Sequence, residues 1–271
     1  MKNTLSKFIV LVFMTTCIFG IIYDCGYNPV DSSDNVSNTN FEAVESISFE
    51  INVINHSRLR LEAINSNINV AGMSNSDSVI ISCEKRVGSE STEDAEAHLQ
   101  QLDVVVQDLS NEIFVKTVQP QETYGRNYMV NYTITLPKNL EVVINNVNGT
   151  VTLDSIDNNV SVNNVNGQIV LEGIFGSVHV VLVNGQIESK VTLPSDGTID
   201  MAIVNGVINL YIPQNTSAEL SASLVNGIIV VNNLDLQNIV SSLTSFQGIL
   251  GDGRGIISLS TVNGNINVMG F

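Results

Sequence analysis

The chain of 271 residues contains no tryptophan, only three cysteines and three histidines, and few basic side chains. Three cysteines cannot form the paired disulfide framework of small secreted proteins. Eleven basic residues stand against 27 acidic ones, which gives a formal net charge of −16. Nucleic acids and anionic lipid surfaces attract proteins through Lys and Arg, so this charge balance excludes nucleic acid as a partner and disfavours charge-driven membrane attachment.

Motifs for catalysis or metal binding are also missing. His56, His98 and His179 lie far apart in the sequence, and no HExxH motif or paired Cys/His spacing accompanies them. There is no Gly-x-Ser-x-Gly elbow and no phosphate-binding glycine loop. We therefore predict no catalytic residue, no metal ligand and no cofactor.

The dominant feature of the sequence is the tripeptide Val-Asn-Gly, which occurs six times. The first five glycines are 18, 18, 21 and 21 residues apart, and the gap of 37 before the last contains a degenerate copy, Phe246-Gln247-Gly248. A recurring period indicates a fold built from repeated structural units. The Asn-Gly pairs are Asn148-Gly149, Asn166-Gly167, Asn184-Gly185, Asn205-Gly206, Asn226-Gly227 and Asn263-Gly264.

Aliphatic residues flank every copy at the same positions. They stand two residues after each glycine, usually four after it, and five and seven before it. Ser189 is the exception among the residues four positions on. The intervening positions are largely Asn, Ser, Thr, Gln and Glu. Spacings of two on both sides of each glycine predict two short strands, each with one buried and one solvent-facing side.

Each Asn-Gly pair is predicted to form a corner, because glycine and asparagine tolerate positive φ. An antiparallel meander of hairpins explains the corners, since Asn-Gly between alternating apolar residues is a strong hairpin signal. A parallel β-solenoid also explains why aliphatic residues return at the same phase in every copy. We therefore predict an all-β fold of stacked coils of 18–21 residues, with corner asparagines in a ladder and the hairpin meander as the alternative.

The repeat pattern also appears upstream, around Asn65-Ser66, which predicts a first coil near residues 57 to 72. Between this coil and residue 141, β-branched and aromatic residues predict strands at 79–84, 113–118 and 129–136. One amphipathic helix is expected over about 92–102, with Ser91 as an N-terminal signal. Cys83 is expected to be a small buried residue. His179 alternates with apolar neighbours and is expected to face solvent.

The chain is predicted to have four segments, beginning with an export signal at 1–24. Lys2 and Lys7 precede an apolar run of 16 residues, which is shorter than the roughly 20 that a membrane-spanning helix needs. A polar tether follows at 25–40, then an N-terminal β-rich part at 41–140 and the repeats at 141–271. Cys25 resembles the acylated cysteine of bacterial lipoproteins, although Tyr23 and Asp24 depart from the small residue that usually precedes it. Lipid attachment at Cys25 and an ordinary cleaved signal peptide remain alternatives.

An enzymatic role has one argument in its favour. Parallel β-helices host many polysaccharide lyases and hydrolases, and Asp154, Asp157 and Asp200 are candidate carboxylates for such chemistry. The repeats nevertheless lack the aromatic residues on which sugars stack, since Tyr211 is the only tyrosine after Tyr132 and tryptophan is absent. A polysaccharide-active enzyme is therefore an alternative, and a non-enzymatic protein is the prediction.

Residues 57–271 resemble the bacterial putative-adhesin family of β-strand repeat proteins, a domain of unknown function. The resemblance rests on the repeated Val-Asn-Gly with an aliphatic residue two positions on, and on the closing sequence GDGRGIISLSTVNGNINVMG. Strand-ending dipeptides contribute to it, namely Leu136-Pro137, Leu193-Pro194 and Ile212-Pro213. It implies a repeat fold and an adhesin-like role, and it carries over no catalytic residue.

The function predicted from the sequence is that of an exported envelope or cell-surface protein, which binds an unknown protein or glycan through polar outer faces. Attachment to a membrane would occur only through the N-terminal signal or a lipid anchor. An envelope sensor or scaffold that engages a membrane partner is an alternative. Self-association is another, because solenoid ends expose unpaired strands and Val268 lies close to the final residue, Phe271.

Overall fold

The computed structural model describes residues 40–53 and 55–271. The predicted export signal, Cys25 and the tether up to residue 39 lie outside these residues, so those predictions stay predictions. No helix among the described residues is long and apolar enough to cross a membrane.

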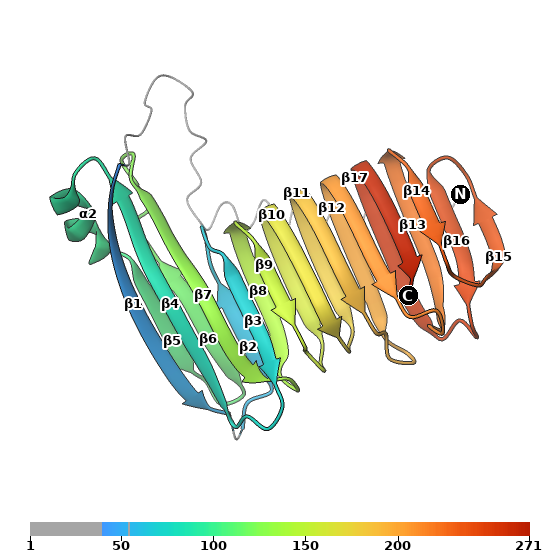
Figure 1. The fold of residues 1–271 in the computed structure, drawn as a ribbon, viewed down its shortest axis with the longest axis horizontal. Helices are drawn as coiled ribbons and strands as arrows, with labels where there is room; N and C mark the ends of the chain where they lie inside the picture. Colours follow the sequence, from blue (N-terminus) through green and yellow to red (C-terminus); the bar gives the residue numbers. More distant parts are fainter. Residues whose placement is uncertain (1–39, 54) are drawn as a thin grey trace.

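The described chain is nearly all β, in one large mixed sheet of 17 strands that does not close. The strands lie side by side along the long axis of the molecule, with α2 at one end and β15 at the other (Figure 1). The elements are β1 (Phe41–Asn52), β2 (Arg58–Glu62), β3 (Ile68–Met73), β4 (Ser78–Ser89), α2 (Thr92–Leu99), β5 (Asp103–Asp108), β6 (Glu112–Val118), β7 (Asn127–Pro137), β8 (Glu141–Asn148), β9 (Val151–Asp154), β10 (Val160–Ile174), β11 (Val178–Val191), β12 (Thr198–Ile212), β13 (Ala218–Asn226), β14 (Ile229–Asn232), β15 (Leu236–Ser241), β16 (Ser245–Leu250) and β17 (Gly255–Gly270).

Successive Val-Asn-Gly copies pair in parallel and in register. β10 pairs with β8 and β9 on one side and with β11 on the other, and β11 pairs with β12. Asn166 is thereby aligned with Asn148 and Asn184, and the same alignment holds for the aliphatic positions on both sides of the corner. Those aliphatic side chains are buried in one continuous core, whereas the residues between them face outward. The all-β prediction is confirmed, and the pairing between these copies is parallel.

The order of the last copies differs from the order in the sequence. β17, which carries the final copy, lies between β12 and the β13–β14 pair and is parallel to all three (Figure 1). The expectation that Val268 lies at an open end is therefore wrong, because this side chain is 1% exposed and its strand has neighbours on both sides. Copies that share one register can pair in any spatial order, so sequence order does not determine which copy is terminal.

The degenerate copy Phe246-Gln247-Gly248 is not a repeat coil. It lies in β16, which pairs antiparallel with β13 and with β15. Gly248 does not have the positive φ that every Val-Asn-Gly glycine adopts. The segment forms a hairpin at the end of the sheet instead, since it lacks the asparagine that lines a corner.

The N-terminal part continues the sheet. β2 and β3 pair in parallel with β8 and β9, and Asn65 forms an isolated parallel bridge with Asn148, so the segment predicted as a first coil is in register with the repeats. Beyond it, β4 pairs antiparallel with β1 and β7, and β5 with β6. The three strands predicted here are present and are longer than or equal to the predicted spans.

α2, the single helix among the described residues, ends three residues earlier than predicted. The Ser91 side chain accepts a hydrogen bond from the backbone N–H of Asp94 and caps its first turn, while Ala95 and Leu99 are buried. The chain then turns so that Leu102, which is also buried, reaches the core just before β5 begins. Cys83 is 3% exposed, as expected, and burial raises the pKa of its thiol to about 12.

Candidate binding surface

A ladder of asparagine side chains runs along the corners of the sheet. Except at Asn65, where the ladder begins, each amide donates from Nδ2 to the Oδ1 of the preceding ladder asparagine, over distances of 2.7 to 2.9 Å. Because an amide has both a donor and an acceptor, one residue type can repeat this bond along the stack. In spatial order, the ladder contains Asn65, Asn148, Asn166, Asn184, Asn205, Asn263 and Asn226.

Glycine follows six of the seven ladder asparagines, and Ser66 follows Asn65. At Gly167 the backbone has a φ of 134°, and an added Cβ would lie 2.1 Å from the carbonyl oxygen of Gly149 in the adjacent strand. The same close approach occurs at the other five Val-Asn-Gly glycines. The corners are therefore stabilised by two linked features, an amide ladder and close contact between backbones.

Two buried asparagines near the corners were not predicted as functional or structural residues. Asn146 and Asn164 are each 3% exposed and donate to carbonyl oxygens of their own corner and of the adjacent one. The sequence signal that could have identified them is Asn-Asn-Val-Asn-Gly, which the first two copies share. The aligned residues in the later copies are apolar except for Thr261. Their Nδ2 groups satisfy backbone carbonyls, and burial keeps both side chains away from a ligand.

The outward side chains form rows across the parallel strands. One row aligns Ser161, His179, Asp200, Ser258 and Ser221, from β10 to β13. All five are partly or fully exposed, and His179 faces solvent as predicted, with 51% of its side chain exposed. Its Nδ1 lies 3.2 Å from Asp200, and this hydrogen bond raises the pKa of the imidazole. The row presents short donors and acceptors at the spacing of adjacent strands, about 4.8 Å.

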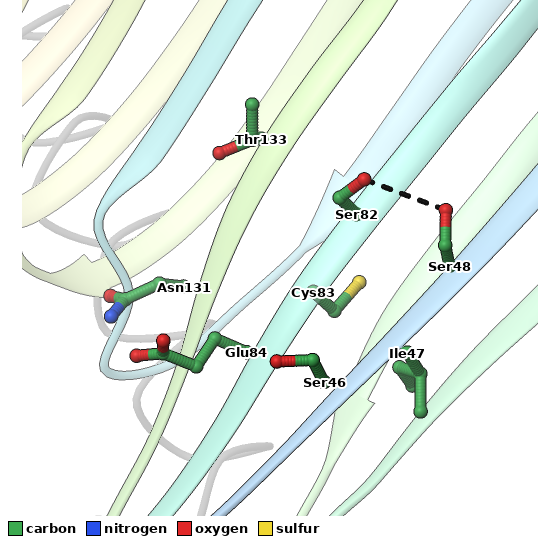
Figure 2. Close-up of a pocket in the computed structure, with 8 residues that line it drawn as sticks. All are labelled: Ser46, Ile47, Ser48, Ser82, Cys83, Glu84, Asn131 and Thr133. Atoms are coloured by element: carbon green, nitrogen blue, oxygen red, sulfur yellow. Dashed lines mark hydrogen bonds between the residues drawn. The ribbon is translucent and has the colours of Figure 1, made fainter.

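A shallow hollow of about 430 Å³ lies over β1, β4 and β7. Figure 2 shows Ser46 and Ser48 on β1, Ser82 and Glu84 on β4, and Asn131 and Thr133 on β7. The two hydroxyl oxygens of Ser48 and Ser82 are 3.5 Å apart. Arg86 donates to Glu84 at 2.9 Å and lowers the pKa of that carboxyl. Pockets for small ligands are usually enclosed and largely apolar, and this hollow is neither. Its side chains could form hydrogen bonds only to one face of a polar ligand.

The carboxylates proposed for polysaccharide chemistry are held in separate interactions. Asp157 forms an ion pair with Lys138, Asp200 contacts His179, and Asp154 accepts from the Ser155 hydroxyl at 3.0 Å. Within the described part of the chain, no group of three or more His, Cys, Asp or Glu residues is placed to hold a metal ion.

A Ser-Asp-His cluster beside α2 has the composition of a catalytic triad but a different geometry. Arg126 donates to both carboxylate oxygens of Asp94, at 2.6 and 2.8 Å, and Ser89 also donates to this carboxylate. The Arg126 hydrogen bonds hold the pKa of Asp94 well below its usual range. Ser89 contacts Asp94 rather than His98, so no nucleophile is paired with a base. The cluster fixes α2 against the loop that precedes β7.

Comparisons with known proteins give matches only among solved structures. No family model matches the chain, and no curated protein matches it. A putative cell adhesion protein from Clostridium sporogenes is 12% identical, with a TM-score of 0.47, and the match covers 84% of this chain and 100% of that one. A putative adhesin from Bacteroides fragilis is 14% identical, with a TM-score of 0.31 and coverage of 83% and 97%. A putative lipid binding protein from Parabacteroides distasonis is 13% identical, with a TM-score of 0.33 and coverage of 82% and 96%. Identities and scores at this level establish no shared function.

Proposed function

We propose that this protein is an exported, non-enzymatic interaction protein of the cell envelope or cell surface, with an adhesin-like binding role. The observation that carries the proposal is the regular row of outward polar side chains from Ser161 to Ser221. The resemblance of the repeats to the putative-adhesin family supports the same direction. A polysaccharide-active enzyme receives no comparable support, because its three candidate carboxylates have separate partners.

The repeats are proposed to be coils of a parallel β-solenoid. Each copy supplies one strand segment before its corner and one after it, and the aliphatic residues of both segments belong to one core. This arrangement gives two outward faces on which equivalent positions of successive copies are aligned. A repeating partner such as a glycan chain suits these faces, since many weak hydrogen bonds along a regular row add up to useful avidity.

The test is binding of the purified protein to a panel of envelope and host-surface polysaccharides and to intact cells. A double variant, Ser258→Lys with Ser221→Lys, places two long charged side chains in the row. Ser74→Lys, in the exposed turn between β3 and β4, is the matched control. We expect the double variant to lose at least tenfold in binding while the control keeps it. Equal binding by all three proteins would exclude the row as the binding surface.

Export and lipid attachment belong to this proposal and have their own test. Mass spectrometry of the mature N-terminus, combined with cell fractionation, distinguishes an acylated Cys25 from an unmodified terminus. Crosslinking in intact cells separates adhesion from a sensor or scaffold role. Recovery of a single membrane protein as the only partner would argue against adhesion.

A further inference from the structure

The far end of the sheet, formed by β14, β15 and β16, has a composition unlike the rest of the molecule. No residue from 225 to 244 is buried, and the segment from 224 to 250 contains a single charged residue, Asp235. Six large apolar residues are exposed within 19 positions. By contrast, Phe175 is the only exposed large apolar residue described between 141 and 217. We call the six residues the terminal patch: Val225, Ile228, Val230, Ile239, Val240 and Leu243.

The terminal patch adjoins a free strand edge. β14 pairs with β17 along one edge, and no other described strand is in register with its opposite edge. β16 occupies the corresponding place beside β13, and the backbone N–H of Leu224 donates to the carbonyl of Thr244 at 2.9 Å. That bond places the hairpin turn, with Leu243, beside the corner that contains Val225 and Ile228. Apolar side chains and unpaired backbone groups therefore occur together at this end.

The two free edges at the other end are protected by charge. Among the described strands, β1 pairs only with β4 and carries Glu42, Glu45 and Glu50, while β5 pairs only with β6 and carries Asp103 and Asp108. Charged side chains on an edge strand are a common means of preventing strand addition. β14, with the sequence IVVN, has none, and it also lacks proline. The molecule thus protects one end of its sheet and leaves the other able to accept a strand.

We propose that the terminal patch and the β14 edge form a docking surface for a second copy of this chain, with two β14 strands paired antiparallel about a twofold axis. Charge selects this occupant. Two copies with a net charge of −16 repel each other at most surfaces, whereas this end brings together two nearly neutral patches and keeps the acidic bodies apart. A basic partner protein is disfavoured, because Asp235 is the only acidic residue at this end with which it could form an ion pair.

The geometry also limits the assembly. A twofold contact uses the same patch on both copies and is closed, so it produces dimers and not filaments. A stable interface buries roughly 800 Å² on each partner. β14 has only four residues, and the terminal patch adds six exposed side chains, so we expect a modest interface centred on them. We expect a dissociation constant in the micromolar range.

The test is sedimentation velocity of the full chain, as purified from its expressing host, over a wide concentration range. Val230→Lys adds a charge to the free edge. Val170→Lys is the matched control, because Val170 is aligned with Val230 through Glu188, Asn209 and Asn267 but lies in the middle of the sheet. The wild type and Val170→Lys should show the same shift from monomer to dimer, whereas Val230→Lys should weaken dimerisation at least tenfold.

A wild-type protein that stays monomeric throughout, or equal weakening by both substitutions, would overturn the proposal. Leu243→Glu is a second test that does not depend on correct folding of Val230→Lys. Leu243 is 93% exposed in the hairpin turn, and its replacement should also weaken dimerisation. A photoreactive amino acid at position 243 then identifies the occupant in cells. A crosslinked homodimer supports a second copy, and crosslinking exclusively to another protein rejects it.

Discussion

Replacement of Thr261 by valine should stabilise the protein. Thr261 lies in β17, aligned with Ile203 of β12 and Leu224 of β13, and its side chain is 4% exposed. Its hydroxyl oxygen has no hydrogen-bond partner among the described residues. A buried polar group without a partner costs about 1–3 kcal/mol, and valine has the same shape without the hydroxyl. We expect Thr261→Val to raise the free energy of unfolding by about 1–2 kcal/mol.

Equilibrium urea denaturation measures this change directly, and the melting temperature should rise by about 3–6 °C for a protein of this size. Thr152→Val is the matched control, since Thr152 lies on the outward side of β9 and its replacement should change stability by less than about 0.5 kcal/mol. A loss of stability in Thr261→Val would refute the reasoning. It would show that the hydroxyl has a hydrogen-bonding partner, such as an internal water, whose contribution exceeds the cost of burial.

Three further predictions concern the corners and the helix. Gly167→Ala should destabilise the protein by at least about 3 kcal/mol through positive φ and a backbone clash, whereas Gly125→Ala, which has positive φ but open space around it, should cost only about 1 kcal/mol in thermal denaturation. Asn184→Ala should lose about twice the stability lost by Asn226→Ala, because Asn184 makes two ladder bonds and Asn226, at the end of the ladder, makes one. Equal losses would mean that the ladder bonds contribute nothing to stability. The lowered pKa of Asp94 stabilises the fold above the carboxyl's unfolded pKa, near 4, and this contribution is lost as the pH falls. Asp94→Asn should therefore flatten the acid side of a plot of stability against pH. An unchanged plot would contradict this expectation.

The repeat body could be predicted because its signals are local and mutually consistent. Alternating aliphatic residues determine the buried side of each strand, and the Asn-Gly pairs determine where the backbone adopts positive φ. The helix could be predicted from Ser91 and the spacing of Ala95 and Leu99. β1 was missed, although Ile47, Phe49 and Ile51 alternate with polar residues in a strand-like pattern.

The spatial order of the last copies could not be predicted, because every copy presents the same corner chemistry to its neighbours. Asn263 is equally compatible with Asn205 and Asn226, and it bonds to both. The terminal patch was missed for a related reason. Ile229 and Val231 occupy core positions of the repeat, yet they are only partly buried, since burial depends on whether another strand follows in space. The sequence predicts polar outward faces. It does not predict which polar residues are aligned in one row, because that depends on the register between strands.

The position of β17 separates the order of synthesis from the order of assembly. Linear repeat proteins can add one unit after another, since each new unit needs only the one before it. Here, β13 and β14 have no direct parallel partner in the preceding repeats, and the strand that joins them to β12 is the last described one to be synthesised. The terminal hairpin block must therefore wait, attached by its loop, until residues 255–270 are inserted. A nascent chain that stalls before residue 255 would leave the exposed edge of β12 and a detached, apolar end piece, which makes this last step the point at which the molecule is most exposed to misassembly.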